Sequence, residues 1–70
     1  MGEFYSVVLF DDSCHCFKNR DNAFAFLWQE FLNTYADRYS DKELEREKEE
    51  MNRLWFIEDF GYIEVCGFED

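Results

Sequence analysis

DNAFAFLWQEFLNTYADR, residues 21–38, is the one long stretch of this chain with a strong helical period. Its apolar residues recur at the spacing of one helix face, at Phe24, Leu27, Trp28, Phe31 and Tyr35. Phe26 lies about 200° around the helix from Phe24, because successive residues turn by about 100°. The stretch therefore predicts a helix with apolar surface to cover on more than one side.

The segments before this helix predict a β-hairpin. Residues 3–10, EFYSVVLF, are rich in β-branched and aromatic residues and too short for a convincing helix, so we expect a strand. Asp11-Asp12-Ser13 is a polar turn, and residues 14–18 can return as a second strand. Asn19 and Asp21 are both suitable N-caps for the helix that follows.

A second helix is expected after residue 39. Ser40 and Glu43 have the spacing of a capping box, and the helical pattern continues to about Phe56. Residues 62–68 then read as a last strand. The sequence thus predicts one domain over residues 1–70 of the α+β class, with the order β-β-α-α-β. We expect a small, mostly antiparallel sheet of three strands in the order 2-1-3, packed on two helices.

Composition limits the compartment and the partners. The chain has no apolar run long enough for a transmembrane helix and no secretory pattern, so we expect a cytoplasmic protein without membrane contact. Three cysteines, an odd number, indicate free thiols in a reducing compartment. The formal charge is −10, from 17 acidic and 7 basic residues, which excludes direct binding to nucleic acid and favours a basic partner. Residues 1–17 contribute −3 of this charge and residues 54–70 contribute −5.

Two sets of residues have the residue types of a chemical site, and each also has a structural explanation. Cys14-His15-Cys16, with Cys66, has the residue types of a metal site, but structural zinc sites use a C-x2–4-C spacing. On a strand, His15 would also point away from the two thiols. Carboxylate pairs are inevitable among 17 acids, and none is marked as an acid–base pair. We therefore predict no metal, no cofactor and no enzymatic activity.

The apolar residues suggest self-association. The first strand is apolar on both faces, and one thin helix cannot easily cover both this strand and the far side of the first helix. We predict a homodimer with a self-complementary apolar patch. Its expected interface residues are Phe4, Val8, Phe10 and Phe26.

The chain resembles a class of small acidic proteins of bacterial viruses. It shares with them its size, its −10 charge and acidic segments such as DKELEREKEE and GFED. These host-takeover and anti-defence proteins include DNA mimics that occupy the DNA-binding surface of histone-like HU proteins, CRISPR effectors or restriction enzymes. The resemblance implies a location in the cytoplasm of the host cell.

The predicted function is therefore an inhibitor that mimics DNA and blocks the DNA-binding surface of a basic host protein. Its carboxylates would stand in for phosphates, which a duplex carries at about one per 1.7 Å. The expected partner-binding residues are Asp11, Asp12, Glu43, Glu47, Glu50, Glu58, Asp59, Glu69 and Asp70. The alternative is an acidic antitoxin-like or regulatory module that binds through an aromatic surface without DNA mimicry. An acidic run such as residues 41–50 is also, more simply, a solvated helix face.

Overall fold

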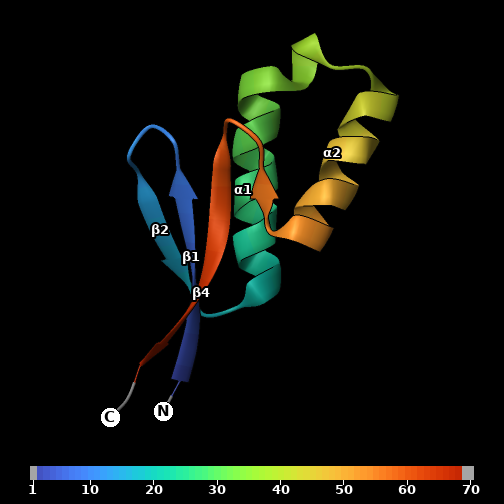
Figure 1. The fold of residues 1–70 in the computed structure, drawn as a ribbon. Helices are drawn as coiled ribbons and strands as arrows, with labels where there is room; N and C mark the ends of the chain where they lie inside the picture. The colour runs from blue at the N-terminus through green and yellow to red at the C-terminus, as the bar shows by residue number, and fades with distance from the viewer. Residues whose placement is uncertain (1, 69–70) are drawn as a thin grey trace.

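The computed structural model describes residues 2–68, which form two helices and a four-stranded antiparallel sheet (Figure 1). The elements in chain order are β1 (Gly2–Leu9), β2 (Cys14–Phe17), α1 (Arg20–Tyr35), the 3-10 turn η1 (Ala36–Arg38), α2 (Asp41–Leu54), β3 (Phe56–Ile57) and β4 (Gly61–Phe68). The sheet order is β2-β1-β4-β3. The α+β class is confirmed, but the prediction of three strands is wrong.

The fourth strand is the short β3. Phe56 pairs with Tyr62 and Ile57 with Gly61, so β3 and β4 form a hairpin at one edge of the sheet. Two residues are too few to show an alternating pattern, and the sequence had placed Phe56 at the end of the second helix. That helix stops at Leu54 because Trp55 is left-handed, with φ of 64°, and its N–H donates to the Met51 carbonyl. The other three strands follow the predicted order 2-1-3.

The helix boundaries follow their capping residues. Asn19, not Asp21, is the N-cap of α1, and its side-chain oxygen accepts hydrogen bonds from the Asp21 and Asn22 N–H groups. Ser40 and Glu43 form the predicted capping box of α2. Each cap satisfies N–H groups that the first turn of a helix leaves without an intrahelical partner.

One face of the sheet carries the core. Val7, Ile63 and Ile57 are buried there against Leu27 and Phe31 of α1, and α2 adds Met51. Gly61 is required at this contact, since a Cβ atom on it would lie 2.8 Å from the Val8 carbonyl oxygen. Figure 1 shows α1 passing behind β4 and β3, with α2 beside it. The predicted face of α1 is confirmed: its five apolar residues are buried or half-buried.

The opposite face of the sheet, here called the open face, is almost free of charge. Within residues 3–67 the strand register places nine residues on it, of which only Glu64 is charged. They are Phe4, Ser6, Val8, Cys14, Cys16, Phe56, Tyr62, Glu64 and Cys66. Neither helix contributes to this face, because the buried residues of both helices belong to the core on the other side.

Candidate functional site: an acid–aromatic groove

Two tight turns bring four of the predicted acids to one end of the molecule. In the turn after β1, Asp11 accepts hydrogen bonds from the N–H and the hydroxyl of Ser13. The turn between β3 and β4 contains Glu58 and Asp59, and Asp59 is left-handed with φ of 59°. The Phe10 N–H donates to the Phe60 carbonyl at 2.9 Å, which joins the two turns. Asp11, Asp12, Glu58 and Asp59 are therefore neighbours in space although 46 residues or more separate the two pairs in sequence.

A cluster of aromatic rings backs these turns. The buried Phe31 ring lies 5.3 Å from Tyr35, 5.4 Å from Tyr39 and 5.5 Å from Phe60, measured between ring centroids. The Phe60 and Tyr39 contacts are edge-to-face, the geometry that the ring quadrupoles favour. The rings hold the end of α1, the start of α2 and the β3–β4 turn together. They form a rigid wall beside the acidic turns.

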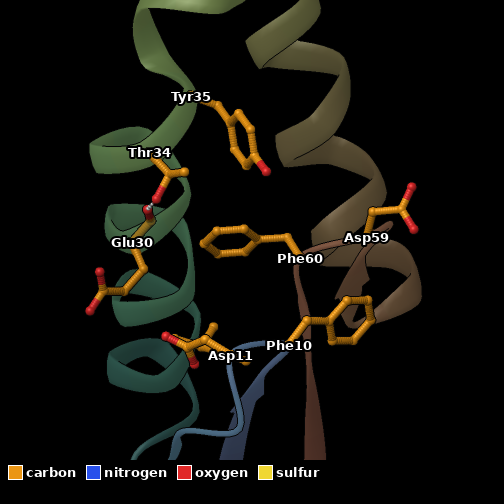
Figure 2. A pocket seen from close by; sticks show the side chains of 8 residues that line it. Phe10, Asp11, Glu30, Thr34, Tyr35, Asp59 and Phe60 are labelled. Atoms are coloured by element: carbon orange, nitrogen blue, oxygen red, sulfur yellow. Dashed lines mark hydrogen bonds between the residues drawn. The ribbon is translucent and has the colours of Figure 1, made fainter.

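The acids and rings line two adjoining hollows, which we name the acid–aromatic groove. One hollow of about 280 Å³ is shown in Figure 2, and the other has about 370 Å³. The two share Tyr35 and Asp59. The first is lined by Leu9, Phe10, Asp11, Glu30, Thr34, Tyr35, Asp59 and Phe60. The second is lined by Phe31, Tyr35, Tyr39, Glu47, Glu58 and Asp59.

The carboxylates surround the groove rather than converge within it. In Figure 2 the rings of Tyr35 and Phe60 project into the space between the helices, while the carboxylates of Glu30 and Asp59 point to opposite sides. Within residues 2–68 no group of three or more His, Cys, Asp or Glu side chains could hold a metal ion. A broad cation that contacts several separated carboxylates suits this arrangement better than a small ion does.

The electrostatics of the groove are dominated by unpaired acids. Among the residues described as lining it, none is basic. The one side-chain ion pair within residues 2–68 joins Arg20 and Asp21, at 3.7 Å, at the start of α1. Burial raises the pKa of Glu47, and the nearby charges of Glu50 and Glu58 raise it further. The hydrogen bonds from Ser13 lower the pKa of Asp11. Glu47 is thus crowded by negative charge at the point where α2 meets the β3–β4 turn.

Among the other predicted partner-binding residues that the structure describes, Asp12, Glu43 and Glu50 line neither hollow. Glu43 is exposed on α2, and Glu50 lies beside Arg46 and Arg53 in a shallow hollow of mixed charge. Glu69 and Asp70 lie outside the described residues. Sequence reasoning missed Glu30, Tyr39 and Phe60. The only available signal was the spacing of Phe31, Tyr35 and Tyr39 at four-residue intervals, although α1 ends at Tyr35 and Tyr39 has extended backbone.

The expected dimer residues have different positions. Phe4 and Val8 lie on the open face, as the strand pattern predicted, but Phe10 follows the end of β1 and is 57% exposed. Phe26 is half-buried against β2, with its ring centroid 4.6 Å from His15 and 5.3 Å from Phe17. The premise that Phe26 needs cover from a second chain is therefore wrong, because the sheet extends far enough to cover it.

The cysteines are free thiols, and the predicted alternation holds. Cys14 and Cys16 pair with Val8 and Ser6 on the open face, while His15 pairs with Val7 on the core face. The Cys14 sulfur lies 3.0 Å from the Ser6 hydroxyl. Cys66 is on β4, with β1 between it and β2.

No helix within the described residues is long and apolar enough to cross a membrane. No protein-family model, no curated protein and no solved structure matches this sequence or fold.

Proposed function

We propose that this protein is an acidic inhibitor that binds the basic surface of a DNA-binding protein and blocks its access to DNA. The observation that carries the proposal is the set of carboxylates gathered without basic partners around the acid–aromatic groove. Five of them line the groove, and Asp12 adjoins Asp11 in the turn after β1. The five are Asp11, Glu30, Glu47, Glu58 and Asp59. Six acids match the lower end of the about 6–10 phosphates that a DNA-binding protein contacts.

The charge of the chain per unit length limits the length of DNA backbone that it can imitate. The Cα atoms span 46 Å along the longest axis, and a duplex of that length carries roughly 27 charges at one per 1.7 Å. The formal charge of the chain is −10. The protein therefore imitates a short part of a DNA backbone and not a whole duplex. Concentrating its unpaired acids at one end raises the local density above this average.

Competition with DNA tests the proposal. A basic protein captured by the chain from a bacterial lysate should lose its bound DNA as the chain is added, and its affinity for the chain should fall steeply with salt. Fluorescence anisotropy of labelled DNA measures the first effect, and titration at 50 and 200 mM salt the second. A captured partner that still holds DNA normally would contradict the proposal.

A matched pair of variants separates the groove from net charge. The groove variant carries Asp11→Asn, Glu47→Gln, Glu58→Gln and Asp59→Asn. The control variant carries Glu3→Gln, Asp37→Asn, Glu45→Gln and Glu49→Gln, which removes four exposed acids that line neither hollow of the groove. Each exposed pair contributes about 0–1 kcal/mol, so the groove variant should bind roughly 30-fold more weakly and the control less than threefold.

The alternative function is an interaction module that binds through an aromatic surface. It gains its support from the rings of Tyr35, Tyr39 and Phe60, which are half-buried and line the same groove. Aromatic contacts are nearly indifferent to ionic strength. Affinity that stays constant between low and physiological salt would favour this module over the DNA mimic.

We further propose that two copies associate through the open face. Of the nine residues between positions 3 and 67 that lie on this face, only Glu64 is charged, in a chain of which 34% of residues are charged. Light scattering at micromolar concentration should show a dimer, and Val8→Glu should dissociate it. A mass of 8.6 kDa for the wild-type chain would contradict association.

A further inference from the structure

On one side of the two helices, basic side chains of this chain lie over its own aromatic rings. A hollow of about 360 Å³, here called the basic hollow, is lined among others by Arg20, Phe24, Trp28 and Lys48. The Arg20 guanidinium lies 4.4 Å from the Phe24 ring centroid and 5.1 Å from that of Trp55. The Lys48 ammonium lies 6.0 Å from the Trp28 ring. Aromatic faces here are paired with cations from the same chain.

The acid–aromatic groove offers the same ring chemistry with the opposite charge. Its larger hollow combines the rings of Phe31, Tyr35 and Tyr39 with the carboxylates of Glu47, Glu58 and Asp59. The Arg38 guanidinium lies 5.6 Å from the Tyr35 ring, within the range of a cation–π contact, and Arg38 lines neither hollow. The Tyr35 ring thus already accepts a guanidinium in this environment.

We propose that the acid–aromatic groove binds an arginine side chain of a basic partner. The guanidinium stacks on the Tyr35 ring and donates hydrogen bonds to Glu58 and Asp59. The inference rests on the proposed function, because it names the group of the basic partner that this groove would recognise. Its grounds are charge complementarity and the shape of the site, in which carboxylates surround aromatic rings.

Arginine fits this groove better than lysine for a geometric reason. A guanidinium is planar, so it can stack on a ring while its five N–H donors reach carboxylates that are spread around the edge. An ammonium is a compact point charge that needs oxygens converging on one position. The carboxylates that line the groove come from α1, α2 and the two turns and do not converge.

Capped tripeptides provide the direct test. Acetyl-Gly-Arg-Gly-amide, the lysine analogue and the citrulline analogue are titrated into the isotopically labelled full chain and followed by NMR chemical shifts. The arginine peptide should shift the signals of Tyr35, Glu58 and Asp59, and bind at least fivefold more tightly than the lysine peptide. The citrulline peptide, which has the shape without the charge, should show no saturable binding. Equal binding of all three peptides, or of arginine and lysine, would overturn the assignment.

Variants then separate the ring from the acids. Tyr35→Leu should lower affinity for the arginine peptide about tenfold, while Tyr35→Phe keeps the ring face and should stay within twofold of wild type. Glu58→Gln with Asp59→Asn should lower affinity about tenfold, and Asn tolerates the left-handed backbone at position 59. The control Glu3→Gln with Glu45→Gln makes the same charge change outside the groove and should stay within twofold.

The outcome also distinguishes this inference from the proposed function. Suppose that the two-residue control loses as much affinity for the arginine peptide as Glu58→Gln with Asp59→Asn does. In that case only net charge decides peptide binding, and the arginine site is overturned, whereas competition with DNA can persist. If arginine binding follows the variants but no DNA-binding partner is displaced, the arginine site stands and the inhibitor function fails.

Discussion

The basic hollow and the acid–aromatic groove have similar size but opposite chemistry. The basic hollow has a volume of about 360 Å³, and the larger hollow of the groove has about 370 Å³. Aromatic residues of α1 line both. In the basic hollow, the Arg20 guanidinium and the Lys48 ammonium lie over rings of the same chain. In the groove, carboxylates from α1, α2 and the two turns lie around the rings without a basic side chain among the described lining residues. Charge in the first region contributes to packing, whereas charge in the second costs stability through like-charge crowding, which is expected where a surface serves binding.

Removing the ring that supports the groove should have the largest effect. Phe31 is 1% exposed and packs against Trp28, Tyr35, Tyr39 and Phe60. Phe31→Ala should cost about 3–5 kcal/mol of unfolding free energy, because it leaves a cavity where the two helices meet. Urea unfolding followed by circular dichroism measures the loss. Leu32→Ala, on the flank of α1, serves as the control and should cost less than half as much. Similar losses for the two variants would mean that the aromatic cluster has no special role.

Breaking the cation–π contacts of the basic hollow should have an intermediate effect. Arg20→Met keeps an aliphatic chain over Phe24 and Trp55 but removes the guanidinium, so it should cost about 1 kcal/mol. The ion pair with Asp21 does not account for this loss, since the Arg20 and Asp21 side chains are 44% and 90% exposed and exposed pairs contribute little. Asp21→Asn should therefore cost only a few tenths of a kcal/mol. If both variants cost the same in thermal unfolding, the ring contacts of Arg20 contribute nothing.

Removing the charge of Glu47 should have the smallest effect on the free energy of unfolding, and it should raise that free energy, not lower it. Burial and the charges of Glu50 and Glu58 raise the pKa of Glu47 above its usual value of 4.5, so the folded state disfavours the ionised form. At pH 7 that carboxylate is charged in both states, and Glu47→Gln should stabilise the fold by a few tenths of a kcal/mol.

The pH dependence of that gain follows from the direction of the pKa change. A raised pKa means that the folded state binds the proton first as pH falls, so the destabilisation by Glu47 is full above its folded pKa and disappears below its unfolded one. The advantage of Glu47→Gln should shrink between neutral pH and the usual value of 4.5. Urea midpoints at several pH values check it, with Glu3→Gln as the control. An advantage that grows on acidification would contradict the assigned direction.

The sequence predicted the helix caps and the apolar face of α1 well, because each depends on residues that are close together in the chain. Asn19 and Ser40 cap their helices because their side-chain oxygens accept the first N–H groups, and that requirement is local. The face of α1 was also readable, since apolar residues at helical spacing must point to one side. The acidic set was only partly readable. Asp11, Asp12, Glu58 and Asp59 were identified by charge alone, without any sign that they meet.

The early end of α2 and the β3 strand could not be read in advance. Trp55 adopts a left-handed conformation that a non-glycine residue rarely takes. Its ring packs against Phe24, 5.1 Å away, and near Tyr5 at 6.1 Å, so tertiary contacts outweigh the local preference. Phe26 shows the same limit. Its need for cover was visible from the helical period, but the position of β2, which supplies that cover, was not.

The sequence by itself determined the composition of this protein's surface and the identity of its elements: a charge of −10, two capped helices, three of the strands and one aromatic helix face. Only the tertiary structure decided that the β1–β2 and β3–β4 turns lie side by side, joined by the hydrogen bond from Phe10 to Phe60. It also decided that the rings of Tyr35, Tyr39 and Phe60 stand behind their carboxylates. The physical reason is that capping and periodicity act over a few residues, whereas a binding surface depends on strand pairing between segments that are distant in the chain.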